Sequence, residues 1–450
     1  MILGRWADLP TTFSFAKQRL RQLALGLADQ GLSAGSMFLV NVVLARTQSK
    51  EDYGLFALSY SIYMFLLGLH TAIVLEPFTV YASGRYQARF ASYLKLMMRS
   101  NALTGATLSV GLLLLCLLSR IFVPSLNSPP LLGLALTVSF ILTGAFLRRS
   151  FYVLRQPEMA ARTSLLFFVV VAALLWITAK TRTLNGFSVF FVLAVAWVIA
   201  SLVVVRKLPP RKLEPAFLDS EPHYWREHWA YMRWVLAQAF VYQFMHQGYY
   251  WLVAGFLSVR EVGELKAMYV LIAPVEQVIV SLSFLFLPAL CAKYAAQNLG
   301  GFFAFWRRYA LLEVGVTVIF ALGVRAVGGR VIHVLYAGKF DDLAPMLFLL
   351  SLVPLTMALG YTLSDAIRAA EKPRLVFYAV VSSAVATFVI GLPLVKYFGL
   401  QGAVYGMLVS GITFTGALAV AFRLRVHKRI SSGTADHYSA APPVPTSEAL

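Results

Sequence analysis

The chain has 450 residues, of which 59% are hydrophobic and only 13% are charged, and its formal net charge is +19 at pH 7. Soluble domains are about 45–50% apolar with roughly 25% charged residues, so this composition excludes a soluble globular protein. The basic residues follow the connections between apolar runs, as membrane topology requires, so they do not indicate a nucleic-acid partner.

The apolar runs are long enough to cross a bilayer as helices. A crossing takes about 20 residues, and lipid offers no partner to unpaired backbone groups, so the runs must be helical. Before the first run, residues 1–22 mix basic residues with aromatic and aliphatic ones, which predicts an interfacial segment at the cytoplasmic surface. Hydropathy then predicts twelve transmembrane helices, near residues 24–45, 54–80, 96–118, 131–153, 164–180, 186–205, 233–257, 266–290, 309–327, 344–366, 375–396 and 402–422.

The longest connection, residues 206–230, is charged and rich in proline, and it divides the twelve helices equally. We expect it to be a cytoplasmic linker between an N-terminal six-helix bundle, residues 23–205, and a C-terminal six-helix bundle, residues 231–423. The tail, residues 424–450, is rich in Ser, Ala and Pro, which predicts a disordered cytoplasmic segment.

Most of the 39 basic residues fall on one side of this topology. Cytoplasmic connections carry the excess of Lys and Arg, so both termini are predicted to be cytoplasmic in a multi-pass protein of the cell inner membrane. The two cysteines, Cys116 and Cys291, have no metal-ligand spacing, and we expect neither a cofactor nor a metal site.

Several short segments recur in the two halves. "LARTQSKEDYGLFALSY", residues 44–60, matches "VAGFLSVREVGELKAMY", residues 253–269, and the match places Ser49 on Ser258 with an offset of 209. Further pairs follow in the same order: Gly54 and Gly263 at 209, Pro77 and Pro288 at 211, Pro157 and Pro373 at 216, and Gly186 and Gly402 at 216. Pro77 and Pro288 are each expected to end the second helix of their half.

This repeat predicts the architecture. Each half holds an even number of spans, so the halves enter the membrane in the same orientation and are related by an axis along the membrane normal. The fold class is therefore an all-α polytopic membrane protein, with twelve transmembrane helices in two parallel-repeat six-helix bundles around a central cavity. Transporters of this kind hold their substrate between the repeats.

The segment "LARTQSKEDYGLFALS" resembles the signature after the first helix of polysaccharide exporters, the lipid-linked oligosaccharide flippases. Their superfamily also contains multidrug-and-toxin extruders and lipid II flippases. The "EKP" turn at residues 371–373 and "FGLQGAVYGMLVSG" at 398–411 fit the same family, and the resemblance covers residues 20–425. It implies a flippase that moves an undecaprenyl-diphosphate-linked repeat unit across the cytoplasmic membrane for surface polysaccharide biosynthesis, with a polysaccharide polymerase and chain-length machinery as partners.

Polar residues inside the spans are the candidates for the transport site. An Asp at mid-helix costs about 2.5–3.5 kcal/mol on insertion scales, so such residues face the bundle interior or a watery cavity. The first and seventh helices supply the cavity or substrate-binding candidates: Asp29, Asn41, Arg46, Gln238, Gln243, His246 and Gln247. Simple interhelical hydrogen bonding would explain Asp29 equally well.

Ion coupling or gating is predicted for a second set: Asp29, His70, Glu76, Pro77 and Glu276, with Glu313 and Asp365 as further acids. A proline frees a backbone carbonyl and can kink a helix, which makes Pro77 a plausible gate. No Lys or Arg lies in the middle of a predicted span, so cations for a diphosphate are expected at helix ends: Arg46, Arg85, Arg89, Arg148, Arg149, Arg155 and Arg260.

Two other functions compete with the flippase. A cation-coupled multidrug antiporter of the same fold would use acidic residues in the first half, and Asp29 and Glu76 are such residues. An integral-membrane polymerase or ligase could use Glu51 and Asp52 in an early external loop. However, the external connections are short and no GxxxxGK[ST] phosphate loop is present, so an enzyme is not expected.

Overall fold

The computed structural model describes residues 12–83, 86–122, 128–208 and 221–424, and the secondary structure of these residues is entirely helical. The helices are α1 (Thr12–Thr47), α2 (Lys50–His70), α3 (Glu76–Ser83), α4 (Phe90–Phe122), α5 (Pro129–Val153), α6 (Pro157–Lys180), α7 (Gly186–Val204), α9 (Glu221–Phe256), α10 (Val259–Ala295), α11 (Leu299–Tyr336), α12 (Ala344–Ala369), α13 (Pro373–Ala386) and α14 (Leu392–Phe422). Short π-helical turns, η1 (Thr71–Leu75) and η6 (Thr387–Gly391), join α2 to α3 and α13 to α14. Short 3-10 turns also occur at η2 (Gln87–Arg89), η4 (Val205–Lys207) and η5 (Asp341–Leu343).

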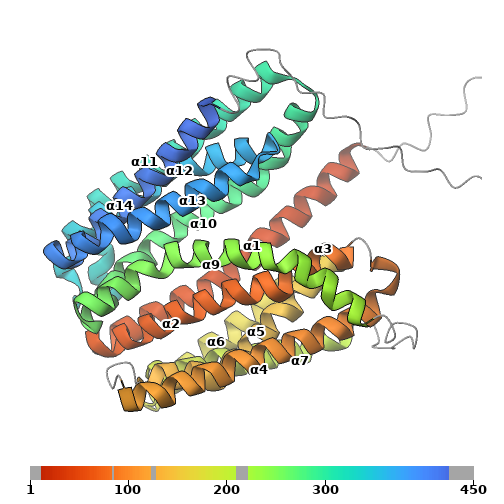
Figure 1. The fold of residues 1–450 in the computed structure, drawn as a ribbon. Helices are drawn as coiled ribbons and strands as arrows, with labels where there is room; N and C mark the ends of the chain where they lie inside the picture. Colours follow the sequence, from red (N-terminus) through yellow and green to blue (C-terminus); the bar gives the residue numbers. More distant parts are fainter. Residues whose placement is uncertain (1–11, 84–85, 123–127, 209–220, 425–450) are drawn as a thin grey trace, which may run out of the picture.

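The predicted twelve-helix all-α membrane fold is confirmed. Ten described segments are long and apolar enough to cross a membrane. The helix α9 is an eleventh that runs between the two ends of the molecule (Figure 1). The last of the ten, residues 373–422, is two spans, because Gly399 adopts φ 61° and ψ −140° and breaks the helical path.

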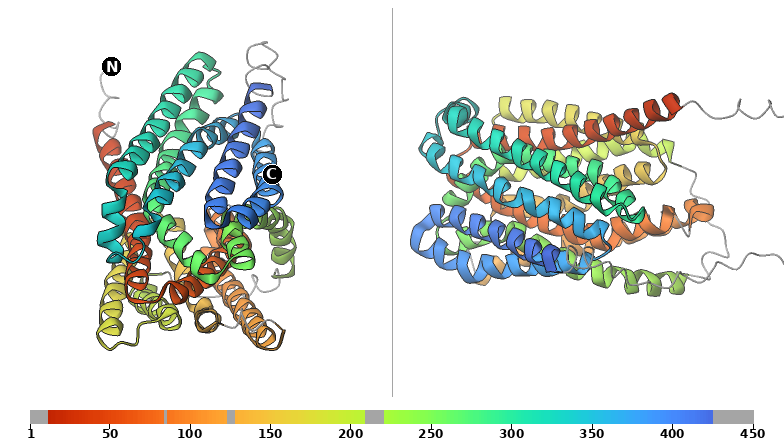
Figure 2. Two further views of the ribbon diagram at one scale, coloured as in Figure 1. Left: turned by 90° about the vertical axis from the view of Figure 1, so that its left-hand side faces the viewer. Right: turned by 90° about the horizontal axis from the view of Figure 1, so that it is seen from above.

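The two halves of the chain lie side by side (Figures 1 and 2). In the first half α1 packs on α6, and α5 packs on α4 and α7; in the second, α12 packs on α10, α11 and α14. Contacts between the halves run mainly along α2, which packs on α10 and α9. The described chain begins and ends at the same end of the molecule (Figure 1), which we call the terminal end; the opposite end is the loop end.

Local conformation repeats at the offsets found in the sequence. The Ser49 hydroxyl caps α2 by accepting from the Asp52 amide at 3.0 Å, and the Ser258 hydroxyl caps α10 by accepting from the Arg260 amide at 3.2 Å. Arg155 and Glu371 have φ values of 57° and 58°, and each stands two residues before a proline that opens a helix. The repeat therefore extends to individual turns.

Two helices, α1 and α9, begin earlier than the sequence predicts. The helix α1 already begins at Thr12, so residues 12–22 continue into the first span, while residues 1–11 lie outside the described residues. The helix α9 begins at Glu221, so residues 221–230 are helical and only 209–220 of the predicted linker and 425–450 of the tail lie outside. Hydropathy missed these extensions because polar residues supply their outer turns.

Neither Pro77 nor Pro288 ends a helix, which corrects the expectation from the sequence. Pro77 follows the π-turn η1, and α3 continues to Ser83; Pro288 lies inside α10, which continues to Ala295. Proline has no N–H to donate to the carbonyl four residues earlier. The π-turn η1 widens the helix at the place where that bond is missing, between α2 and α3.

Candidate functional site: a cleft between the two bundles

At the loop end, α2 and α10 cross through two glycines. A Cβ on Gly54 would lie 1.8 Å from the carbonyl oxygen of Val259, and a Cβ on Gly263 would lie 2.6 Å from that of Lys50. Lys50 and Val259 are themselves related by the offset of 209, so the two contacts are equivalent under the repeat. The crossing closes the loop end with backbone against backbone, which only glycine permits.

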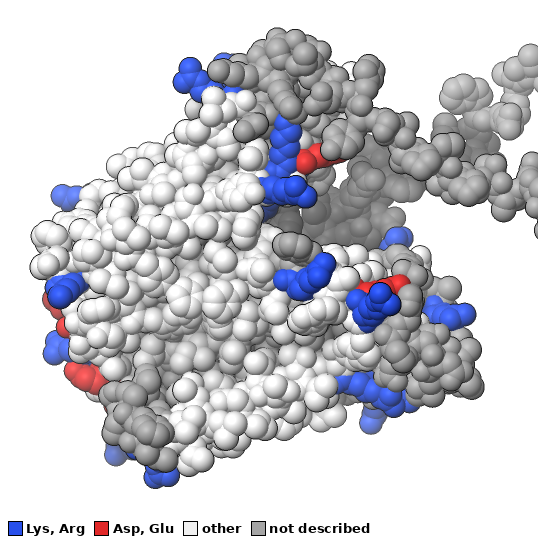
Figure 3. Space-filling model, viewed as in Figure 1, with Lys and Arg blue, Asp and Glu red and all other residues white. Residues whose placement is uncertain are grey.

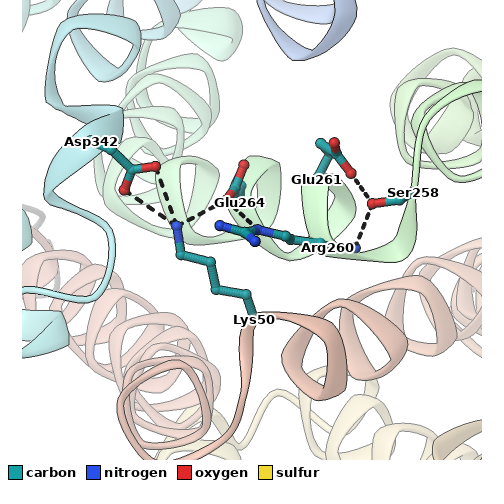
Figure 4. Close-up of polar contacts among 6 residues, drawn as sticks. All are labelled: Lys50, Ser258, Arg260, Glu261, Glu264 and Asp342. Carbon is teal, nitrogen blue, oxygen red and sulfur yellow. Dashed lines mark hydrogen bonds and ion pairs between the residues drawn. The ribbon is translucent and has the colours of Figure 1, made fainter.

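Ion pairs reinforce this closed end (Figure 4). The Lys50 ammonium lies 2.9 Å from Glu264 on α10 and 3.3 Å from Asp342 in η5, and Arg260 donates to Glu264 at 3.3 Å. The side chains of Lys50 and Glu264 are only 12% and 10% exposed. Lys50 therefore joins the first half of the chain to two elements of the second through shielded contacts.

A second lysine, Lys339, reaches from the second half of the chain to the first. The Lys339 ammonium donates to the carbonyl oxygens of Ala45 and Arg46, each at 3.1 Å, and to that of Gln48. These carbonyls end α1, where the helix dipole favours a cation. Burial, followed by repulsion from Lys50, lowers the pKa of Lys339. The predicted site residue Arg46 contributes its backbone here, while its side chain is exposed.

Toward the terminal end the two halves separate. Figure 3 shows a hollow between them at this end, with Lys and Arg around it and an uncharged belt across the middle of the molecule. The molecule is therefore closed at its loop end and hollow at its terminal end. The belt agrees with a multi-pass membrane protein.

A polar and aromatic wall in the second half lines the space between the helices. The Glu276 carboxylate accepts from the Tyr269 hydroxyl at 2.6 Å. It lies within electrostatic range of Tyr242, Tyr250 and Tyr361, which come from α9 and α12. Glu276 is half-buried and Tyr242 is 42% exposed, so solvent reaches this wall.

The α9 candidates lie along the same wall or beside it. His246 places its Nδ1 3.0 Å from the Tyr242 carbonyl oxygen and stacks on the Tyr242 ring at 4.1 Å. Gln238 is exposed, Gln243 packs against Gly68 of α2, and Gln247 is half-buried. These residues could hydrogen-bond a polar cargo that entered the cleft.

Lys266 is a cation that reasoning from the sequence missed. It lies two turns inside α10 and is only 8% exposed, and its Nζ is 4.3 Å from the centre of the Tyr60 ring and 5.7 Å from that of Tyr250. Among the residues that the structure describes, no carboxylate lies within ion-pair distance of it. The predicted span began at Lys266, whereas α10 begins at Val259, so the structure places this cation two turns inside the helix instead of at its edge. The cap residue Ser258 was the signal that could have revealed it.

Asp29 lies inside the first half rather than in the cleft. Its buried carboxylate accepts from the Tyr152 and Ser164 hydroxyls, each at 2.5 Å, and lies 3.6 Å from the Arg148 guanidinium. These partners hold it between α1, α5 and α6.

Asn41 is likewise buried. It accepts from the Tyr53 hydroxyl at 3.1 Å and donates to the Met37 carbonyl at 2.7 Å. It packs α1 against α2 and does not face the space between the halves.

The gating candidates of the second span surround the π-turn. His70 is buried with its Nε2 2.8 Å from the Asn101 amide oxygen, and its Nδ1 has no partner among the described residues. Glu76 accepts from the Tyr231 hydroxyl of α9 at 3.1 Å, and Pro77 is buried beside it. Arg85, one of the predicted cations, lies outside the described residues.

A pair of acids, Glu313 and Asp365, lies between α11 and α12, and Glu313 is within electrostatic range of Tyr361 in the wall. Tyr309 lies beside both acids and donates to Asp365 at 3.0 Å, and Arg368 is 3.8 Å from the same carboxylate. Glu313 is 0% exposed, and neither of its carboxylate oxygens has a hydrogen-bond partner among the described residues. A buried carboxylate without a partner is costly unless a proton or a cation accompanies it.

No protein-family model and no curated protein sequence matches the chain. Several solved structures match the chain. One is the inward-facing conformation of a multidrug resistance MATE family transporter of the MOP superfamily. It matches with a TM-score of 0.71 and 14% sequence identity, over 90% of this chain and 95% of that one. The chain has the MATE transporter fold. An outward-facing conformation of such a transporter gives a TM-score of 0.65 at 12% identity, over 92% and 95%.

A further similar structure is of a transporter whose binding pocket has reversed polarity. It is a MOP superfamily transporter from Pyrococcus furiosus, with a TM-score of 0.63 at 12% identity over 92% and 95% of the chains, whose reversed binding-pocket polarity suggests a different function. These neighbours are transporters rather than enzymes. At these identities the likeness establishes the fold, and the cargo has to be argued from this chain's own residues.

Proposed function

We propose that the chain is a flippase that carries an undecaprenyl-diphosphate-linked oligosaccharide repeat unit across the cytoplasmic membrane by alternating access. Lys266 is the observation that carries this proposal. Lys266 is buried beside the rings of Tyr60 and Tyr250 and within electrostatic range of Glu276, but it has no ion-pair partner among the described residues. Such a cation attracts an anion, and a diphosphate is the charged part of the expected cargo. The tyrosines, His246 and the α9 glutamines then supply surfaces on which sugar rings can stack and hydrogen-bond.

In this mechanism the bundles at residues 23–205 and 231–423 rock about the cleft. The terminal end is cytoplasmic, as the basic residues predict, so the described state would load cargo from the cytoplasm. Opening the loop end then requires the contacts of Lys50 and Lys339 to break while the terminal end closes. The inward- and outward-facing neighbours of the same fold support such a cycle. A polymerase and chain-length machinery would take up the product.

Multidrug extrusion is the second candidate. Its support is Glu276, an acid on the solvent-accessible wall, together with the tyrosine rings that could hold an organic cation. Asp29 and Glu76 support it less than the sequence suggested. Asp29 is already neutralised by Arg148, and Glu76 is bound by Tyr231.

For coupling we propose Glu313, with Asp365 beside it. Its unpartnered carboxyl group has to be accompanied by a proton or a monovalent cation, and it lies in the bundle that also carries the cleft wall. Movement of that ion with the conformational cycle would link transport to a gradient.

Deletion of the gene tests the function. The measurement is the amount of lipid-linked intermediate in each leaflet of the membrane. The proposal expects repeat units to accumulate at the cytoplasmic face; their normal arrival at the periplasmic face would overturn it. New sensitivity to organic cations in the same strain would favour the antiporter. Reporters fused after residue 425 and within residues 209–222 test the topology, since a periplasmic signal from either contradicts cytoplasmic termini.

A further inference from the structure

The first three turns of α9, residues 221–231, pack on the first half of the chain, although the rest of the helix continues into the second half. At 1.5 Å per residue the 36 residues of α9 extend about 54 Å, well beyond the roughly 30 Å of hydrocarbon. The extra length places this segment at the terminal end, over α3 (Figure 1). The predicted linker therefore contains a structured element that both halves share.

One face of this segment carries the contacts. Its residues follow the spacing i, i+3, i+4 and i+7: Tyr224, Glu227, His228 and Tyr231. The His228 Nε2 lies 3.0 Å from the Tyr93 hydroxyl of α4, and both side chains are buried. Tyr86 donates to Glu227 at 3.0 Å, and Tyr231 donates to Glu76 at 3.1 Å.

Stacked rings fill the spaces between these hydrogen bonds. Tyr224 lies 4.7 Å from Tyr86 between ring centres, and His228 lies 5.1 Å from Tyr81. The other face of the segment exposes Trp225 and Trp229, one turn apart, as residues at the level of lipid headgroups do. The segment is thus held on one side by the first half and suited to the membrane interface on the other.

The opposite part of α9 is held by the second half. The buried Tyr249 hydroxyl lies 2.9 Å from the Ser410 hydroxyl of α14, which lies 3.0 Å from that of Thr387 in η6. A Cβ on Gly391 or Gly406 would come within 3 Å of the Tyr249 hydroxyl, so this packing leaves no free space. This part of α9 also contacts the first half, because the Trp251 Nε1 donates to the Ser61 hydroxyl of α2 at 3.0 Å, and separation of the halves here would break that hydrogen bond.

We propose that residues 221–231 form a clamp that stays on the first half throughout the cycle, and that α9 bends between Tyr231 and Tyr249 when the halves move. Releasing the clamp would break three hydrogen bonds and several ring contacts at once, whereas a helix bends with small changes in each of its own bonds. The clamp makes α9 the pivot between the bundles in place of a loose linker. His228 and Tyr93 are positioning residues in this arrangement.

Spin-label distances test the clamp without any cargo, which matters because the inference rests on the proposed alternating access. In a background with Cys116 and Cys291 replaced by alanine, Arg162→Cys in α6 is paired with Arg374→Cys in α13 to report opening, and with Trp225→Cys to report the clamp. Each pair is measured with Lys50 intact and in Lys50→Met, which releases the loop end.

We expect the 162–374 distance to change and the 162–225 distance to stay constant. A 162–225 change as large as the 162–374 change would overturn the clamp while leaving alternating access intact. No change at 162–374 in any condition would refute alternating access, and the bending of α9 with it.

A second measurement assigns the clamp to its residues. The double variant Tyr93→Phe with His228→Ala should broaden the distribution of distances between the labels at positions 162 and 225. Trp229→Phe, on the opposite face of the segment, should leave this distribution narrow. A narrow distribution in the double variant would overturn the role given to the buried pair.

Discussion

Replacement of Lys50 by methionine should release the loop end of the transporter. The lysine and Glu264 are largely shielded, so their charged hydrogen bond contributes about 1.5–3 kcal/mol to the closed state. Asp342 is 59% exposed, and its pair with Lys50 adds less than about 1 kcal/mol. Because Arg260 stays with Glu264, the full penalty of an orphaned buried charge does not arise. We expect a net loss of about 2 kcal/mol, which raises the ratio of open to closed loop ends about 30-fold.

The assay is a distance between spin labels across the loop end, at Thr47→Cys and Gly255→Cys. Lys50→Met should populate a longer distance, and Glu264→Gln should do the same. The effects of the two substitutions should not add in the double variant, because both remove the same interaction. Lys180→Met serves as the control, since Lys180 is exposed, lies in the same half and has no ion pair with any residue that the structure describes. A distribution for Lys50→Met that matches the control would refute the assignment of the ion pair to closure.

Three further outcomes follow from the geometry. Gly54→Ala should also open the loop end, at a cost of about 1–3 kcal/mol from overpacking. Gly323→Ala in α11, whose added Cβ would meet nothing within 4 Å, should leave the label distance unchanged; equal behaviour of the two variants would show that the glycine crossing is not tight. Burial lowers the pKa of His228 to about 4. The clamp should therefore be fully stable above about pH 6.5 and weaken by about 3 kcal/mol as the pH falls toward 4. Fluorescence of Trp225 and Trp229 should report this change, and the same pH profile in His228→Gln would exclude His228 as the titrating group. Glu313→Gln should fold normally and lose the dependence of transport on an ion gradient; an unchanged dependence would remove Glu313 from coupling.

Much of the fold was predictable because it depends on local rules. Apolar length gave the spans, and the serine caps at Ser49 and Ser258 and the proline turns before Pro157 and Pro373 revealed the repeat. Each of these features is fixed by a few neighbouring residues.

The site was less predictable because it depends on where helices begin and which faces meet. Lys266 looked like the edge of a span until the cap at Ser258 moved the start of α10 two turns earlier. Asp29 looked like a cavity residue because its partners, such as Arg148, are more than a hundred positions away. The clamp looked like a linker because its aromatic residues contact Tyr93 and its neighbours, which are far away in the sequence.

The most direct test of the account is translocation of an undecaprenyl-diphosphate-linked oligosaccharide by the purified protein in proteoliposomes. We predict that the wild-type protein and Lys266→Arg move the lipid across the bilayer. In Lys266→Met, loss of a charge-assisted contact with the diphosphate, about 1.5–3 kcal/mol, should slow movement at least about tenfold. Glu276→Gln should have a smaller effect. Equal rates for wild-type and Lys266→Met, or translocation of an organic cation but not of the lipid, would contradict the account.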